Sequence, residues 1–150
     1  MCSSDLTTLA DTHDFAKKFI SEISGSREHV VALSGDLGAG KTTFTKACGE
    51  VLGITETIVS PTFVIAKFYE IPNLEEGSGE NFPWKQFVHI DAYRLESWSE
   101  LEKLGFAEVF DDPETLVFIE WPEQVGDTDQ DIWKVLSFEI EGDERVVSCV

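Results

Sequence analysis

The chain carries the segment Gly35-Asp36-Leu37-Gly38-Ala39-Gly40-Lys41-Thr42, which satisfies the phosphate-loop pattern G-x-x-x-x-G-K-[ST]. An apolar, β-branched run over 30–33 precedes this segment and predicts a strand over 30–34. A helical pattern over 42–52 follows it and ends at a glycine. Because a phosphate-binding loop lies between a strand and a helix, this context favours such a loop over the alternative, a glycine-rich turn with an exposed lysine.

The residue types in this segment suit the chemistry of phosphate binding. A glycine-rich backbone adopts conformations closed to residues with a Cβ, so that successive N–H groups can point at phosphate oxygens. The helix that follows adds the positive end of its dipole and its unpaired amides. Lys41 supplies a full positive charge for the β- and γ-phosphates, and the Thr42 hydroxyl suits a Mg²⁺ that bridges them.

The composition indicates one globular domain over residues 1–150. The 150 residues are enough for a sizeable core, and no apolar run approaches the roughly 20 residues that cross a bilayer. Since the first residues lack the pattern of a signal peptide, a cytoplasmic protein is expected. The three cysteines, Cys2, Cys48 and Cys149, lack metal-ligand spacing and are expected as free thiols, with a structural disulfide as the alternative.

The charge of the chain is strongly acidic. It comprises 29 acidic and 11 basic residues, a formal net charge of −18. Direct binding of nucleic acid normally requires a basic surface that displaces counterions from the phosphates. Any role near RNA is therefore expected to pass through another protein, and the acidic residues form a solvated surface or steer a basic partner.

Strand and helix patterns alternate along the chain, which predicts an α/β domain with a mostly parallel central sheet flanked by helices. Antiparallel additions are expected at a hairpin, around an exposed loop over 72–83, and at the C-terminus. A first helix is expected up to Ser24, capped by Thr12 or Asp11. The other expected elements are strands over 63–69, 86–90, 116–119, 135–141 and 145–150, a helix over 100–104 and a helical turn over 107–110.

Two apolar strands each end in an acid, Asp91 after 87–90 and Glu120 after 116–119. Ligands of open α/β sheets bind at the carboxyl ends of the strands, and each segment resembles a Walker B strand. One of the two acids is expected to contact Mg²⁺, directly or through water, while the other orients the attacking water. The alternative is that either is an ordinary strand-end acid on an acidic surface.

Several further positions keep more than one interpretation. Ser60 and Thr62 stand where nucleotide switches place a hydroxyl that senses the γ-phosphate, or they simply begin a strand. Arg94 could stabilise the transferred phosphoryl group or pair with an acid. Trp121 could cover the nucleotide, face a partner or only pack. His89 is expected to be packed and hydrogen-bonded rather than catalytic, because its neighbours are apolar.

Four ordered motifs, spread over about residues 6–150, give the chain a resemblance to a known family. They are the extended loop 35–44, Ser60-Pro61-Thr62, His89-Ile90-Asp91-Ala92-Tyr93-Arg94-Leu95, and Ile119-Glu120-Trp121-Pro122-Glu123. With these motifs the chain resembles the TsaE (formerly YjeE) family, the P-loop ATPases of bacterial tRNA threonylcarbamoyladenosine biosynthesis. Ala92, where the family has a larger apolar residue, and the long loop over 72–83 depart from its pattern.

The resemblance implies a weak, partner-stimulated, Mg²⁺-dependent ATPase that acts with TsaB and TsaD in modifying adenosine 37 of tRNA, where TsaD performs the transfer. It implies that Lys41, Asp91 and Glu120 are catalytic and that Thr42 and Glu120 hold Mg²⁺. A contact to adenine is expected within 9–12. The ATP-binding residues that it implies are Asp36, Leu37, Gly38, Ala39, Gly40, Lys41, Thr42, Thr43 and Glu123. The turn at Gly142 is also expected to approach the nucleotide.

ATP is expected rather than GTP, because no Asn/Thr-Lys-x-Asp segment for reading guanine is present. A small-molecule kinase and a nucleotide-gated adaptor are the alternative functions. Kinases usually need an acceptor pocket and an arginine-rich lid, and the three scattered arginines of this chain argue against one. An adaptor would act through its nucleotide-bound state rather than through turnover.

Overall fold

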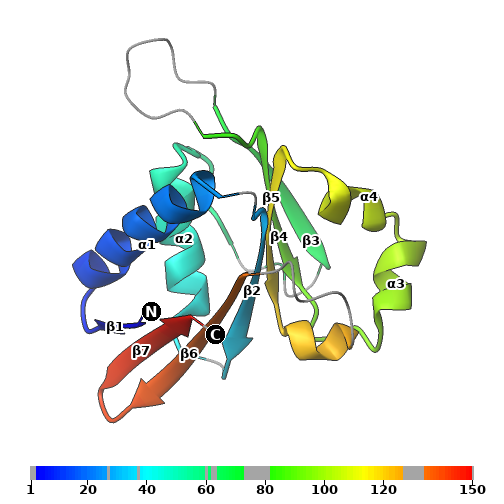
Figure 1. Cartoon of the computed structure of the whole chain (residues 1–150). Coiled ribbons are helices and arrows are strands. Elements are labelled where there is room, and N and C mark those ends of the chain that lie inside the picture. The colour runs from blue at the N-terminus through cyan, green and yellow to red at the C-terminus, as the bar shows by residue number, and fades with distance from the viewer. Residues whose placement is uncertain are drawn as a thin grey trace.

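The computed structural model describes residues 3–26, 28–36, 38–59, 61, 64–72, 82–126 and 134–149. Within these residues, seven strands form one sheet in the order β1-β7-β6-β2-β5-β4-β3 (Figure 1). The strands are β1 (Ser3–Leu6), β2 (Val30–Gly35), β3 (Ala66–Glu70), β4 (Gln86–Asp91), β5 (Thr115–Glu120), β6 (Lys134–Glu141) and β7 (Glu144–Cys149).

The centre of the sheet is parallel and both of its edges are antiparallel. Strands β6, β2, β5 and β4 pair in parallel. Strand β3 is antiparallel to β4, and β7 is antiparallel to both β6 and β1. The predicted α/β class, with antiparallel additions at the hairpin and the C-terminus, is therefore confirmed. The parallel register of β4 and β5 sets Asp91 beside Glu120.

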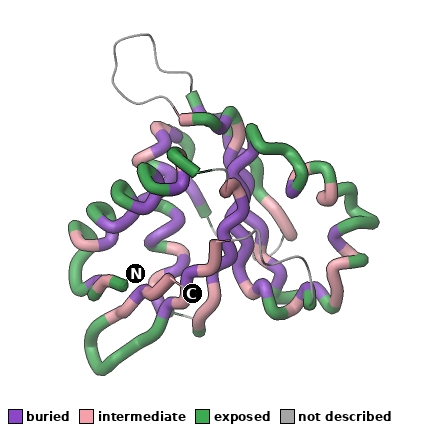
Figure 2. Tube along the Cα trace, viewed as in Figure 1, coloured by how far each residue is buried: buried purple, intermediate pink, exposed green. Residues whose placement is uncertain are grey.

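Helices cover both faces of the sheet (Figure 1). On one face α1 (Leu9–Ser24) packs against α2 (Lys41–Val51). The other face carries α3 (Trp98–Lys103) and α4 (Ala107–Asp111), and the 3-10 turn η1 (Pro122–Val125) follows β5. Figure 2 shows that burial is concentrated in the central strands. None of the described helices has both the length and the apolar character that a bilayer crossing requires.

Phe44 of α2 lies at the centre of the larger apolar layer. It is 0% exposed. The centroid of its ring lies 5.6 Å from that of Phe15, 5.7 Å from Phe19, 5.9 Å from Phe118 and 5.5 Å from Phe138. These four rings belong to α1, β5 and β6, so a single side chain ties the helix after the loop to both its neighbouring helix and the sheet.

The N-terminal region differs from the sequence-based expectation. Helix α1 begins at Leu9 and its N-cap is Thr8, so the predicted caps Thr12 and Asp11 were wrong. The Thr8 hydroxyl accepts a hydrogen bond from the Asp11 N–H at 3.1 Å, and the Asp11 carboxylate accepts one from the Thr8 N–H at 3.1 Å. Strand β1 was not expected, because a four-residue strand carries too little alternation and is specified by its pairing with β7.

Smaller differences concern α3, the cysteines and one loop. Helix α3 begins earlier than predicted, at Trp98. The prediction of free thiols is wrong for Cys149, which is disulfide-bonded. It is confirmed for Cys48, and burial raises the pKa of the Cys48 thiol. Most of the predicted exposed loop lies outside the described residues, although β3 and β4 on either side of it do form the expected antiparallel pair.

We expect Phe44→Ala to lower the free energy of unfolding by about 3–5 kcal/mol, the range for emptying a buried aromatic site. Phe68→Ala is the matched control, because Phe68 is 48% exposed on the edge strand β3. Its expected loss is about 1 kcal/mol or less. Urea denaturation followed by circular dichroism measures both changes, and equal losses would contradict the central position of Phe44.

Candidate functional site

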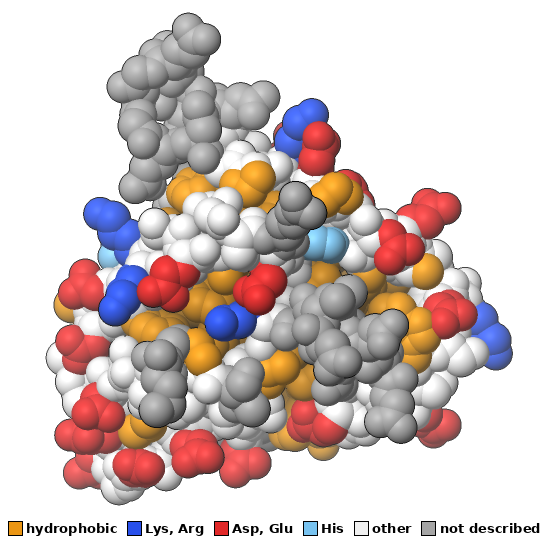
Figure 3. Space-filling view, in the orientation of Figure 1, with side chains coloured by type: hydrophobic (Ala, Val, Ile, Leu, Met, Phe, Trp, Pro, Cys, Tyr) orange, Lys and Arg blue, Asp and Glu red, His pale blue; other side chains and the backbone are white. Residues whose placement is uncertain are grey.

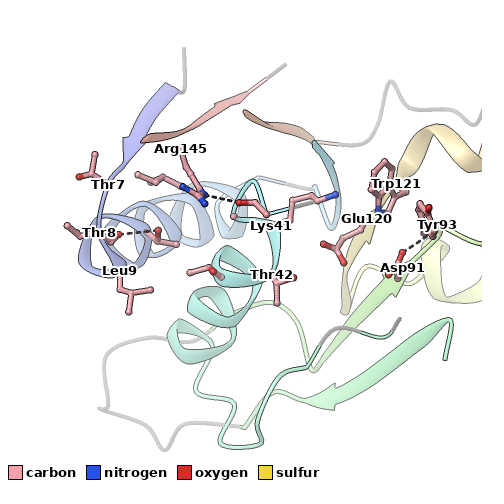
Figure 4. Close-up of a pocket in the computed structure, with 15 residues that line it drawn as sticks. Thr7, Thr8, Leu9, Lys41, Thr42, Asp91, Tyr93, Glu120, Trp121 and Arg145 are labelled. Atoms are coloured by element: carbon pink, nitrogen blue, oxygen red, sulfur yellow. Dashed lines mark hydrogen bonds between the residues drawn. The ribbon is translucent and has the colours of Figure 1, made fainter. Parts of the chain in front are cut away.

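The loop between β2 and α2 lies at the carboxyl edge of the parallel strands and borders a pocket of about 580 Å³ (Figure 4). Four parts of the chain surround this pocket: the loop with the start of α2, the ends of β4 and β5, the segment that joins β1 to α1, and Arg145 of β7. The residues that line it are Leu6, Thr7, Thr8, Leu9, Thr12, Gly38, Gly40, Lys41, Thr42, Thr43, Asp91, Tyr93, Glu120, Trp121 and Arg145.

Three glycines of the loop, Gly35, Gly38 and Gly40, have positive φ. Gly35 has φ 141°, and a Cβ at this position would lie 2.4 Å from the carbonyl oxygen of Phe138 on β6. Gly38 has φ 80°, but a Cβ there would meet nothing within 4 Å. Residues with a Cβ rarely adopt either backbone conformation. Gly35 is therefore restricted both by its φ and by the close approach of β2 to β6, whereas Gly38 is restricted by its φ alone.

Lys41 places its ammonium group inside the pocket. The residue is 5% exposed. Its Nζ donates a hydrogen bond to the carbonyl oxygen of Gly35 at 2.5 Å and lies 4.1 Å from the centroid of the Trp121 ring. None of the ion pairs among the described residues involves Lys41. A buried cation without a carboxylate partner attracts an anion strongly, because little water screens its charge.

Asp91 and Glu120 end adjacent strands and line the pocket opposite the start of α2 (Figure 4). Their environments differ. Glu120 is 4% exposed, and its Oε2 lies 3.1 Å from Nε2 of the buried His89. Asp91 is half-buried and accepts a hydrogen bond from the Tyr93 N–H at 3.0 Å. His89 is therefore packed and hydrogen-bonded, as predicted.

Trp121 directly follows Glu120 and has an unusual backbone conformation. Its φ is 57°, the one positive φ among the non-glycine residues that the structure describes. A left-handed tryptophan costs of order 1–3 kcal/mol and persists only where its surroundings hold it. The ring packs against Tyr93 with centroids 5.2 Å apart, at 60°, and its face meets the Lys41 ammonium. This geometry confirms packing and shows that Trp121 borders the pocket.

The side of the pocket away from the acids is formed by segments far apart in the sequence. Arg145 of β7 reaches the loop, where its Nε donates a hydrogen bond to the Gly38 carbonyl oxygen at 2.7 Å. Thr7 and Thr8 lie beside it because β1 pairs with β7. The hydrogen bonds from the Thr7 hydroxyl, followed by those from backbone N–H groups, hold the pKa of Asp11 below its ordinary value.

Thr42, Asp91 and Glu120 offer hydroxyl and carboxylate oxygens, the donors that Mg²⁺ prefers. In the part of the chain that the structure describes, no three His, Cys, Asp or Glu side chains converge to hold a metal ion by themselves. This donor set fits Mg²⁺, because that ion is usually bound through one or two carboxylates together with the phosphates of a substrate.

Comparison with known proteins identifies the family. Residues 6–147 match the model of the family described as "Threonylcarbamoyl adenosine biosynthesis protein TsaE". The chain belongs to the TsaE family. Two relatives carry the name tRNA threonylcarbamoyladenosine biosynthesis protein TsaE. The one from Borreliella burgdorferi is 34% identical over 135 residues, 89% of this chain and 88% of the relative. The one from Rickettsia typhi is 35% identical over 122 residues, which cover 79% and 72%.

A solved structure shares the fold of this chain. The crystal structure of Bacillus subtilis YdiB superposes with a TM-score of 0.65 at 26% identity, covering 99% of this chain and 83% of that one. The motifs that suggested the TsaE family are thus supported by both the family match and the fold.

The pocket of this TsaE-family chain gathers many of the predicted residues, but not all of them. Those that line it are Gly38, Gly40, Lys41, Thr42, Thr43, Asp91, Glu120 and Trp121, together with Leu9 and Thr12 from the expected adenine region. Asp36, Ala39, Arg94 and Glu123 are not among its lining residues. Leu37, Ser60 and Thr62 lie outside the described residues.

Sequence reasoning missed Thr7, Thr8, Tyr93 and Arg145 as lining residues. Tyr93 follows Asp91 in one of the four motifs, which was a usable signal. The Thr8-x-x-Asp11 spacing indicates a capping box and could have located the start of α1. Arg145 carried no local signal, because only the pairing of β7 with β6 and of β6 with β2 brings it to the loop.

We expect Gly35→Ala to destabilise the fold more than Gly38→Ala does. The Gly35 variant meets both an unfavourable φ and the Phe138 carbonyl, whereas the Gly38 variant meets only the φ penalty of about 1–2 kcal/mol. Free energies of unfolding in urea measure the two losses. A Gly38→Ala loss equal to or larger than the Gly35→Ala loss would contradict the close approach of β2 to β6.

Proposed function

We propose that this chain is the Mg²⁺-dependent ATPase subunit of tRNA threonylcarbamoyladenosine synthesis at adenosine 37 and acts in the cytoplasm with TsaB and TsaD. Its TsaE relatives are named for this biosynthesis. One observation carries the nucleotide part of the proposal: the buried Lys41 ammonium faces the pocket and forms no ion pair among the described residues. A polyphosphate supplies the missing negative charge.

The triphosphate of ATP would lie along residues 38–43, against the loop amides and the N-terminus of α2. The adenosine would then occupy the side of the pocket formed by Leu6, Leu9 and Thr12. Leu9 supports this orientation, because it is 76% exposed and an apolar base would cover it. Glu123 stays a predicted contact, since it is exposed on η1 and does not line the pocket.

Hydrolysis requires a water aimed at the γ-phosphorus and groups that stabilise the developing negative charge. Asp91 would orient this water and accept its proton as the water oxygen bonds to phosphorus and the bond to the β–γ bridging oxygen breaks. Lys41 and the loop amides would stabilise the charge on the departing ADP. Mg²⁺, held by Thr42 and Glu120, would supply further positive charge at the phosphate oxygens.

Partner proteins would complete this site, so that the isolated chain hydrolyses ATP slowly. Asp91 is half-buried at the rim of the pocket, and the Trp121 ring lies on the cation that the γ-phosphate needs. Binding of TsaB and TsaD would reposition Asp91 and the Trp121 ring. Ser60, Thr62 and Arg94 are the further candidates for a switch. Acidic side chains are spread over the face in Figure 3, which supports indirect rather than direct contact with tRNA.

We expect Lys41→Ala to weaken ATP binding by about 10- to 100-fold, since a hydrogen bond between charged groups contributes about 1.5–3 kcal/mol. Lys46→Ala is the matched control, because Lys46 is an exposed lysine of the same helix. Isothermal titration calorimetry of each variant with ATP and Mg²⁺ gives the dissociation constants. The proposed site is wrong if the two variants bind ATP equally well.

We expect ATP turnover by the wild-type chain to be low alone and to rise when TsaB and TsaD are added. Glu120→Gln should keep ATP affinity without Mg²⁺ but lose most of the stimulated turnover, because it loses the charge next to the ion. Phosphate release measures turnover. Fast turnover without partners would contradict the proposal. A soluble acceptor that collects the γ-phosphate would favour a kinase, and stimulation of the partners without turnover would favour an adaptor.

A further inference from the structure

His89 is a buried histidine beneath the pocket, and it does not line that pocket. It lies on β4 opposite Phe118 of β5, with its side chain on the same face of the sheet as Asp91. The residue is 0% exposed. Its ring belongs to the layer of the fold that α2 covers, next to the carboxylate that the proposed function assigns to Mg²⁺.

The two ring nitrogens of His89 have different surroundings. Nε2 lies 3.1 Å from Oε2 of Glu120. Nδ1 is buried and has no hydrogen-bond partner in the described part of the chain. A carboxylate oxygen only accepts hydrogen bonds, so Nε2 must carry the hydrogen. Because Nδ1 has no partner among the described residues, the hydrogen of the contact with Glu120 is assigned to Nε2.

We propose that His89 is a positioning residue for the metal carboxylate, an inference that rests on the proposed Mg²⁺–nucleotide site. The Nε2–H of His89 holds Oε2 of Glu120 and thereby turns the other carboxylate oxygen, Oε1, toward the pocket. Within the described residues the Glu120 carboxylate accepts no other hydrogen bond. Among the described residues, this is therefore the contact that orients the carboxylate.

A role in packing alone does not account for these contacts. An apolar side chain of similar size would fill the same space without burying a nitrogen that has no partner among the described residues. The histidine keeps that unsatisfied nitrogen and gains one contact with Glu120. Donors behind a metal-binding side chain fix its orientation, and their loss typically costs about 10- to 100-fold in metal affinity.

The proposal is tested by the effect of Mg²⁺ on ADP binding in wild type, His89→Gln and His89→Asn. The glutamine amide nitrogen can stand close to the position of Nε2, whereas the asparagine amide is one methylene shorter and does not reach Glu120. Calorimetric titrations of ADP with and without Mg²⁺ give, for each chain, the factor by which Mg²⁺ strengthens binding. This readout does not depend on hydrolysis.

We expect the Mg²⁺ factor of His89→Gln to stay within about threefold of wild type and that of His89→Asn to fall about tenfold or more. ADP binding without Mg²⁺ should be unchanged in both variants, which a general loss of structure would not allow. A wild-type Mg²⁺ factor in His89→Asn, or an equal loss in the two variants, overturns the positioning role. No Mg²⁺ effect in wild type overturns both this role and the proposed metal site.

A second measurement decides the matter if the variants do not fold. Long-range ¹⁵N–¹H spectra of the wild-type chain distinguish protonated from bare ring nitrogens, and His89 is recognised among the three histidines by the slow exchange of its buried N–H. We expect Nε2 to carry a hydrogen. A ring protonated on Nδ1 alone would remove the donor to Glu120 and overturn the proposal.

Discussion

The buried ammonium of Lys41 is the constraint on which the site depends. It is held by the Gly35 carbonyl and the Trp121 ring, neither of which neutralises its charge. The chain as a whole is strongly acidic, yet no carboxylate among the described residues pairs with this cation. A cation kept unpaired in such a chain indicates that the site is built for an anion, and its position after β2 indicates a phosphate.

The sheet brings the other groups to this cation from both directions. On one side, β5 and β4 end in Glu120 and Asp91. On the other side, β6 and β7 place Arg145 against the loop, and β1 adds Thr7. The antiparallel hairpin at the C-terminus therefore has a role in the site beyond extending the sheet, because its Arg145 side chain hydrogen-bonds to the Gly38 carbonyl oxygen of the loop.

The local patterns of the sequence predicted the centre of the fold and much of the site. A strand, a glycine-rich loop and a helix follow one another in the chain, and apolar strands that end in acids can be recognised one at a time. What local patterns could not predict depends on contacts between distant segments. Strand β1 exists because β7 pairs with it, and Arg145 reaches the loop because β7 lies beside β6.

A second difficulty for sequence-based prediction concerns residues that suit more than one position. Asp11 is a good N-cap residue, and here it serves instead as the third helical residue of a capping box whose N-cap is Thr8. Glu123 lies close to Glu120 in the sequence, but the turn at Trp121 redirects the chain, and η1 carries Glu123 to the surface, where it does not line the pocket. The position of a residue in the sequence therefore indicated which part of the fold it lies in, but not which way its side chain points.

Calorimetric titration of ATP with Mg²⁺ into the purified, folded wild-type chain, with GTP as the comparison, tests the phosphate-binding loop most directly. One ATP bound per chain, with weaker binding of GTP, is the expected result. The absence of any heat of binding for ATP, from a chain whose circular dichroism shows it to be folded, would contradict the central claim that the Lys41 loop is a nucleotide site.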